Sequence, residues 1–192
     1  MFFWRFREEE YFIYGRTVIG YQIDISALKG RKQILQKQGK GEKSLVYIII
    51  LLTLFIGDGI IKYLVENLID QKERIPILGG KLFLTKYHNF GAFLNLGEKK
   101  KELVKLTAAV ITLLCLLLFI VTLGRHGKRL LKWALSLLLG GAFSNMCDRL
   151  TRGYVVDYFG FRVKNKRLRN VIFNISDFGI MIGAVLLVIA AR

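Results

Sequence analysis

The sequence contains little cysteine, histidine or proline. Its two cysteines, Cys115 and Cys147, both lie within apolar runs, and its two histidines, His88 and His126, are far apart along the chain. No CxxC pair and no cysteine–histidine cluster with zinc spacing occurs, so we expect no disulfide framework, no metal and no cofactor. Both histidines fall in expected loops, where a lone histidine is more often solvated than a ligand. The single proline, Pro76, is also expected in a loop, where it interrupts no helix.

Acidic residues are also scarce, whereas basic and apolar residues are abundant. The 192 residues include 14 Asp and Glu against 30 Lys and Arg, a net charge of +16, yet 53% of them are hydrophobic. No nucleic-acid-binding motif and no Walker or Rossmann glycine loop accompanies this charge, so we expect no nucleic-acid partner. The basic residues are separated from long apolar runs, a pattern typical of a membrane protein with basic loops.

Four apolar segments each approach the ~20 residues that a helix needs to cross a bilayer. They cover about 45–65, 106–123, 130–147 and 171–191. The predicted fold is therefore an all-α membrane protein with four transmembrane helices, preceded by a basic tail over residues 1–44. The first segment is too long for a cleaved signal peptide and follows this tail, which favours a retained helix.

The orientation follows from the number of segments and from the charge of the tail. An even number of spans places both termini on one side of the membrane. The basic tail makes that side the cytoplasm by the positive-inside rule, although the other loops are basic as well. Within the tail, residues 30–43 are typical of a solvated linker, and no function follows from their sequence.

The loop between the first two apolar segments has a strand-like pattern. Residues 75–78 and 81–87 show partial alternation of apolar side chains and are separated by Gly79 and Gly80. This pattern predicts a small β-hairpin on the membrane surface. A solvated loop without strands is the alternative.

Two ionisable residues interrupt the first apolar segment. Asp58 and Lys62 are four residues apart, with the acid first, so they share one helix face and are expected to form an ion pair. Charged side chains within a membrane are costly and are therefore candidates for function. A self-neutralising pair that helps helices to pack is the alternative.

Three more polar residues end the third apolar segment. Asn145, Asp148 and Arg149 share one face of the predicted helix. We expect Asp148 and Arg149 to form a structural clamp in which the guanidinium satisfies the carboxylate. Gly140 and Gly141, one turn earlier, would let another helix approach closely.

Two aspartates flank the loop between the third and fourth segments. Asp157 follows a strand-like stretch, and Asp177 lies three residues after Asn174 in the predicted fourth helix. If the two helices are antiparallel neighbours, the two carboxyl groups lie at the same membrane depth. Such a pair keeps one proton and can activate water against a peptide carbonyl. Paired acids in a membrane can equally carry ions, which leaves an ion-coupled transporter open, although no internal repeat is visible.

A Ser–Lys hydrolase is a further class that the residues argue against. Ser144 and Ser44 are the serines considered for such a site, and no lysine lies close to Ser144 in the sequence.

The motifs formed by these residues resemble those of the bacterial lipoprotein signal peptidase (signal peptidase II) family. The resemblance is carried by GGAFSNMCDRLTRGYVVDYF (Gly140–Phe159), FNISD (Phe173–Asp177), HNFGAF (His88–Phe93) and the D-x-x-x-K pattern of Asp58 and Lys62. These pieces occur in family order from about Leu45 to the C-terminus.

The resemblance implies a membrane aspartic endopeptidase of the bacterial cytoplasmic membrane. Such enzymes remove the signal peptide from prolipoproteins, cutting before the Cys that carries a diacylglyceryl group. Asp157 and Asp177 would be the catalytic pair, near the extracytoplasmic surface, and the hairpin would form the family's β-cradle over the site. Matched position by position, the residues implied to bind substrate or support the site are Asn89, Gly91, Asn145, Asp148, Arg149, Asn174, Asp58 and Lys62.

The chain departs from the family pattern at several positions, which is typical of a divergent member. Phe93 and Leu94 replace a usual small residue and Phe, Phe178 follows the second Asp where Ser is common, and Gly59 replaces Gln. None of these removes a catalytic residue. The partners implied are a lipidated precursor and membrane lipid, and a monomer is expected. A non-catalytic protein of the same fold that binds lipidated precursors is the alternative function.

Overall fold

The computed structural model describes residues 25–71, 73–91, 100–164, 169 and 171–192. The chain divides into two units, one up to Gly39 and one from Lys40 onward. Of the first unit only the backbone from Ile25 is described, and it is helical, so residues 30–43, which the sequence indicates as a linker, are part of α1. The first 24 residues of the tail and the departures at Phe93 and Leu94 lie outside the described residues.

Four helices carry the apolar segments. They are α1 (Ile25–Leu68), α2 (Lys101–Leu123), α3 (Arg129–Thr151) and α5 (Ile175–Ala190). Among the residues that the structure describes, three stretches are long and apolar enough to cross a membrane, namely Ser44–Leu68 of α1 and all of α2 and α3. The apolar helix α5 has 16 residues and begins at Ile175 rather than near 171, because Asn174 caps its N-terminus in an extended conformation.

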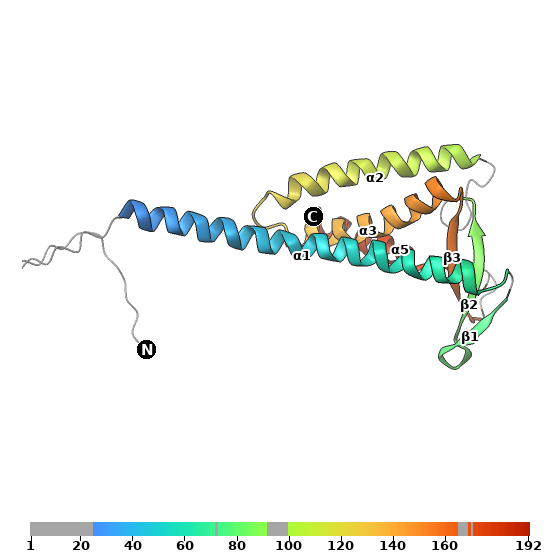
Figure 1. Ribbon diagram of the computed structural model, residues 1–192. Helices are drawn as coiled ribbons and strands as arrows, with labels where there is room; N and C mark the ends of the chain where they lie inside the picture. The colour runs from blue at the N-terminus through green and yellow to red at the C-terminus, as the bar shows by residue number, and fades with distance from the viewer. Residues whose placement is uncertain (1–24, 72, 92–99, 165–168, 170) are drawn as a thin grey trace, which may run out of the picture. The chain divides into compact units, whose positions relative to one another are not determined.

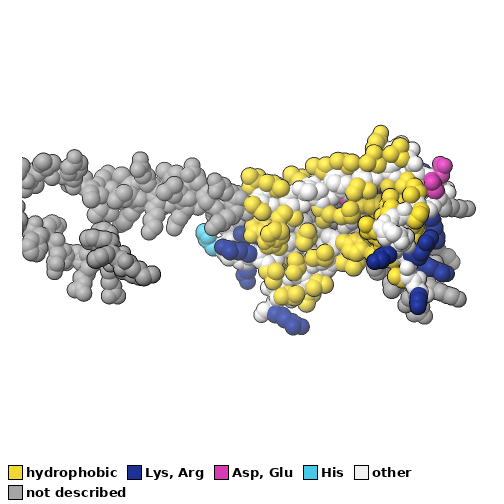
Figure 2. Space-filling view, turned by 90° about the horizontal axis from the view of Figure 1, so that it is seen from below, with side chains coloured by type: hydrophobic (Ala, Val, Ile, Leu, Met, Phe, Trp, Pro, Cys, Tyr) yellow, Lys and Arg dark blue, Asp and Glu magenta, His cyan; other side chains and the backbone are white. Residues whose placement is uncertain are grey.

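The central helix of the second unit is α3. It packs against both α2 and α5, and 56% of its most apolar window is buried, against 17% for the membrane-length stretches of α1 and α2. The outer faces of α1, α2 and α5 carry the exposed apolar side chains that cover much of the surface in Figure 2. A surface of this kind is compatible with lipid rather than with water.

Small residues on α3 allow close helix contacts, as the sequence predicts. A Cβ atom placed on Gly140 would lie 2.8 Å from the main-chain oxygen of Leu51 on α1. A Cβ atom on Gly141 would collide with the main-chain oxygen of Ser176 on α5. The two adjacent glycines therefore bring α1 and α5 against α3, and with them the residues of the site.

An antiparallel sheet adjoins one end of the helices (Figure 1). Its strands are β1 (Ile75–Ile77), β2 (Leu82–Asn89), β3 (Val155–Phe161) and β4 (Ile172–Phe173), in the order β1-β2-β3-β4. The predicted hairpin is present as β1 and β2, joined by the 3-10 turn Leu78–Gly80. The fold is therefore not simply all-α with a hairpin, because β3 and β4 extend that hairpin into a four-stranded sheet.

The sheet corrects one further expectation and explains the position of another residue. Pro76 lies in β1 rather than in a loop, and this edge strand accommodates its missing N–H. The pairing of β2 with β3 is interrupted between Leu84 and Tyr87, after which Tyr87 lies opposite Asp157. The strand that carries Asp157 is thus fixed on both sides, by β2 and by β4.

Candidate functional site

A cavity of about 670 Å³ lies between the sheet and the helices. Its walls are mainly apolar side chains of α2, α3 and α5, and its polar lining consists mostly of residues that the sequence singles out. These polar lining residues include Asn89, Asn145, Arg149, Asp157 and Asp177. The structure therefore brings both candidate acids to one cavity, from segments 20 positions apart in the sequence.

Asn174 binds both carboxyl groups. Its side-chain Nδ2 donates to Asp157 Oδ1 at 2.7 Å, and its main-chain N–H donates to Asp177 Oδ2 at 3.1 Å. Its Oδ1 in turn accepts from the main-chain N–H of Asp177 at 2.9 Å, which completes a capping box at the start of α5. One fully buried residue thereby fixes the two acids relative to each other.

Two further amides complete the hydrogen bonding of the pair. Asn89 Nδ2 donates to Asp157 Oδ2 at 2.9 Å, and Asn145 Nδ2 donates to Asp177 Oδ1 at 3.0 Å. Each carboxyl oxygen of the pair therefore accepts one N–H from a neutral group. Neutral donors orient the acids without supplying a cation that would hold both in the charged form.

The environment of Asp157 favours its protonated form. The residue is 2% exposed on β3, and burial raises its pKa to about 8, with a further contribution from the negative charge of Asp177. The hydrogen bonds from Asn89 and Asn174 and the charge of Lys62 oppose this rise. The pair is consequently suited to hold one proton near neutral pH, as general acid–base chemistry at two carboxyl groups requires.

Arg149 lines the cavity but does not form the predicted clamp with Asp148. Its Nη2 donates to the main-chain oxygen of Gly91 at 2.9 Å, and its Nη1 donates to the main-chain oxygen of Asn145 at 3.3 Å. Asp148 instead binds Arg152 at 3.0 Å, Lys62 at 3.0 Å and the main-chain N–H of Val156 at 3.1 Å. Arg149 is thus free of a carboxylate partner among these contacts and fastens the turn after β2 to α3.

The predicted ion pair between Asp58 and Lys62 is present, with Lys62 Nζ 2.8 Å from Asp58 Oδ2 and both residues 1% exposed. It is not a self-contained pair, because Lys62 also donates to Asn145 Oδ1 at 2.7 Å. By binding this oxygen, Lys62 sets the amide so that its NH2 group faces Asp177. The ion pair therefore supports the site by orienting the Asn145 amide that binds Asp177.

Sequence reasoning missed three partners of this ion pair. Asp58 accepts hydrogen bonds from Ser144 and Ser176 at 2.6 Å each and from Tyr158 at 2.8 Å. These residues lie 86 to 118 positions away from Asp58, so no local spacing links them to it. Their only signal in the sequence is their position beside Asn145, Asp157 and Asp177.

The reason for setting aside a Ser–Lys hydrolase also changes. Lys62 Nζ lies 3.0 Å from Ser144 Oγ, so a lysine does accompany this serine in space. However, Ser144 is 3% exposed, donates its own proton to Asp58 and is not part of the cavity wall. A buried serine in this position has no route to a substrate carbonyl.

Within the described part of the chain, no group of three or more His, Cys, Asp or Glu side chains is arranged to hold a metal ion. The polar groups that the cavity presents include two acids, the amides around them and Arg149.

Comparison with known proteins decides the family. The sequence model of the signal peptidase II family matches residues 49–191, which include every residue of the cavity and of the ion-pair network. The chain belongs to the signal peptidase II family.

Relatives and solved structures agree with this assignment. The lipoprotein signal peptidase of Fusobacterium nucleatum is 33% identical over 146 residues, which cover 76% of this chain and 86% of that protein. That of Trichormus variabilis is 35% identical over 137 residues, covering 71% and 83%. A solved bacterial membrane enzyme superposes with a TM-score of 0.65 at 26% identity, covering 76% of this chain and 87% of that one.

Proposed function

We propose that this signal peptidase II family member removes the signal peptide from diacylglyceryl-modified prolipoproteins, cutting before the lipidated Cys with Asp157 and Asp177 as its catalytic pair. The observation that carries the proposal is the double hydrogen bonding of Asn174 to both carboxyl groups at the wall of one cavity. Two acids that line one largely apolar cavity and are held together by neutral donors share a proton, which is the state that peptide hydrolysis needs.

The mechanism follows from this state. The ionised carboxyl group of the pair removes a proton from a water molecule, whose oxygen attacks the carbonyl carbon of the scissile bond. The protonated carboxyl group donates to the carbonyl oxygen, and a tetrahedral intermediate forms. When the intermediate collapses, the carbon–nitrogen bond breaks, the protonated carboxyl group gives its proton to the leaving amine, and a hydroxyl of the intermediate returns a proton to the other carboxylate, so the pair again holds one proton. Asn89, Asn145 and Asn174 keep the carboxyl oxygens oriented through these steps.

The cavity fits a lipidated substrate. Leu103, Ile111 and Met181 are among the apolar residues that line it, and a groove between helices is suited to acyl chains. The guanidinium of Arg149 and the main-chain groups near Gly91 supply polar contacts next to the acids. We assign Asn89, Gly91 and Arg149 to substrate contact, and Asp58, Lys62 and Asp148 to support of the site.

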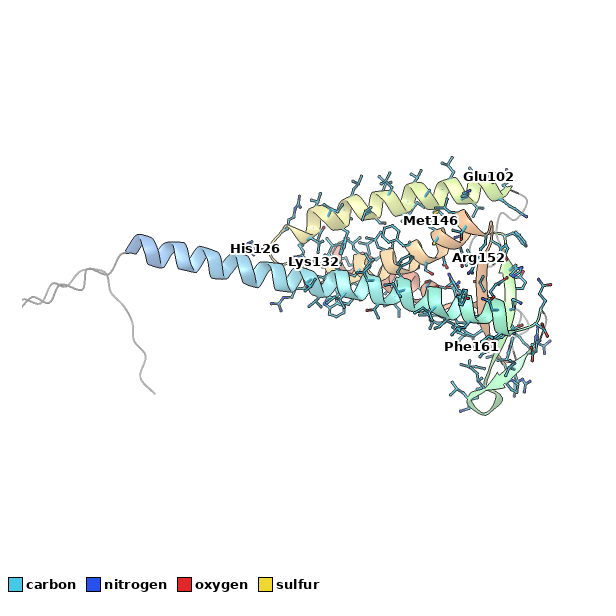
Figure 3. All side chains as sticks on the ribbon, viewed as in Figure 1. Glu102, His126, Lys132, Met146, Arg152 and Phe161 are labelled. Carbon is cyan, nitrogen blue, oxygen red and sulfur yellow. The ribbon has the colours of Figure 1, made fainter. Side chains whose placement is uncertain are left out.

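The arrangement of helix ends supports the proposed topology. Glu102 at the start of α2 and Arg152 at the end of α3 lie at the sheet end, whereas His126 lies at the opposite end (Figure 3). At about 1.5 Å per residue the 16 residues of α5 reach roughly 24 Å, nearly the thickness of the hydrocarbon layer. We propose that α5 is a fourth span, that both termini are cytoplasmic, that the sheet and site lie near the extracytoplasmic surface, and that the protein acts as a monomer.

Purified protein incubated with a diacylglyceryl-modified precursor tests the function directly. We expect mass spectrometry to show a mature product that begins with the lipidated Cys, and no cleavage of the same precursor without lipid. Binding of the lipidated precursor without cleavage, beside an active family enzyme as a positive control, would favour the non-catalytic alternative.

The pH dependence of cleavage should report the proton on Asp157. Activity is expected to fall as pH rises through the pKa of about 8, since the pair then loses the proton it must donate. Asn89→Ala removes a donor that stabilises the charged carboxylate, so the pKa rises further and the alkaline limb of the kcat profile moves to higher pH, by up to about one unit. A limb that stays in place or moves to lower pH would contradict this assignment.

A further inference from the structure

A second polar cluster lies next to the site, formed by Glu66 near the end of α1, His88 on β2 and Tyr154 in the turn before β3. His88 Nε2 lies 3.1 Å and 3.2 Å from the two carboxylate oxygens of Glu66, and the hydroxyl of Tyr154 donates to Glu66 Oε1 at 3.1 Å. The rings of His88 and Tyr154 stack with centroids 4.0 Å apart. His88 is therefore not the solvated loop residue that the sequence indicates. We call these three residues the Glu66 cluster.

The hydrogen bonds assign the protons in the cluster. A carboxylate only accepts, so Nε2 of His88 carries a proton and donates to Glu66, while Nδ1 accepts from Gln71 Nε2 at 3.4 Å. Burial and the nearby Glu66 carboxylate raise the pKa of Tyr154, so its hydroxyl remains a donor. The cluster is thus held together by the hydrogen bonds that His88 and Tyr154 donate to the Glu66 carboxylate.

The position of His88 links this cluster to Asp157. His88 and Asn89 are the last two residues of β2, and successive side chains of a strand point to opposite faces of the sheet. On one face Asn89 donates to Asp157, and on the other face His88 binds Glu66. The β2–β3 pairing is irregular between Leu84 and Tyr87 and resumes at Tyr87, so the ladder joins this strand end to β3 but does not join it to α1.

α1 supplies the rigid support in this arrangement. Lys86 Nζ also donates to the main-chain oxygen of Glu66 at 3.0 Å, so two side chains of β2 bind one residue of the helix. Without the Glu66 carboxylate, the end of β2 keeps on this face the Lys86 bond to the main chain of residue 66, the long Gln71–His88 contact and the ring stacking. A shift of less than 1 Å would lengthen the bond between Asn89 and Asp157 beyond hydrogen-bonding range.

We propose that Glu66, through His88 and Tyr154, is a positioning residue that holds the end of β2 so that Asn89 keeps its hydrogen bond to the catalytic Asp157. This inference rests on the proposed function, since its readout is cleavage. Glu66 does not line the cavity and does not touch either acid of the pair among the contacts described. Its effect reaches the reaction only through Asn89.

The test compares Glu66→Ala, Asn89→Ala and the double variant in the detergent-solubilised full chain. Glu66→Ala is expected to lower kcat about tenfold with KM changed less than twofold, and to move the alkaline limb of the kcat profile upward, as Asn89→Ala does. The double variant should have the same kcat, and the same alkaline limb in its pH profile, as Asn89→Ala alone, because both changes remove the same hydrogen bond. Glu66→Gln keeps an acceptor oxygen for Tyr154 and His88 and should retain at least half of kcat.

The controls separate positioning from general destabilisation. Glu102→Ala removes an exposed acid from the same end of the molecule and should leave kcat and the limb unchanged. All rates are compared per folded protein, judged by elution as a single species and by thermal unfolding. Three results would each overturn the inference. They are an alkaline limb of the kcat profile that does not move in Glu66→Ala, losses of kcat that multiply in the double variant, and a kcat of Glu66→Gln as low as that of Glu66→Ala. A wild-type protein that does not cleave would refute the proposed function instead.

Discussion

Replacing Asp157 or Asp177 with Asn is expected to lower cleavage of a lipidated precursor by at least about 10³-fold while the protein remains folded in the membrane. Each substitution keeps the size of the side chain but removes a group that exchanges protons with the water and the leaving amine. The donors Asn89 and Asn174 would still face position 157, so the change should act on chemistry more than on folding. Single-turnover rates of precursor cleavage, measured by gel shift or mass spectrometry, check this result.

Asp70→Asn is the matched control for this experiment. Asp70 is exposed beyond the end of α1, and its side chain is not part of the cavity. Its replacement should leave the rate within twofold of wild type. Near wild-type cleavage by either Asp157→Asn or Asp177→Asn would remove that residue from the catalytic pair.

Lys62→Met is expected to cause the largest loss of stability among single substitutions in the second unit. The ammonium of Lys62 is 2.8 Å from Asp58 and 3.0 Å from Asp148. The variant removes this positive charge and leaves the two buried carboxylates without it. Removing one partner of a buried ion pair costs about 3–5 kcal/mol. For a chain of this size such a loss corresponds to a decrease in unfolding temperature of at least about 6 °C, measurable by fluorescence in detergent.

Two companion variants show whether charge is the cause. Asp58→Asn together with Lys62→Met removes a buried negative charge as well, so it should recover part of the lost stability. Lys81→Met deletes an exposed lysine from the turn before β2 and should change the unfolding temperature by less than about 2 °C. An unfolding temperature of Lys62→Met equal to that of Lys81→Met would show that the buried network does not stabilise the fold.

Much of the site follows from local patterns in the sequence. Asp58 and Lys62 are four residues apart on an apolar helix, a spacing that fixes their contact whatever the tertiary structure. Asn174 and Asp177 likewise form a capping box at the spacing that the helix N-terminus requires. Gly140 and Gly141 mark close helix contacts because no other residue permits that approach.

Other features required the folded chain. Asp148 binds Arg152 four residues further along α3, whereas the contact of Arg149 with Gly91 depends on where the turn after β2 lies, so adjacency in the sequence led to the wrong pairing. His88 appeared isolated because its partners, Glu66 and Tyr154, are 22 and 66 positions away. The four-stranded sheet was only partly visible: the sequence indicates β1, β2 and a strand-like stretch before Asp157, whereas the two residues of β4 are too few to give a periodic signal.

The sequence by itself determined the apolar helices and the ion pair of Asp58 with Lys62, because each depends on composition or on spacing within one helix. Only the tertiary structure decided that Asn174 joins Asp157 to Asp177, that Lys62 orients the amide of Asn145, and that Glu66 reaches the end of β2. The physical reason is that hydrogen bonds and ion pairs act over about 3 Å. Residues from α1, β2, β3 and α5 come within that distance only after the helices pack around α3 and the sheet closes over one end.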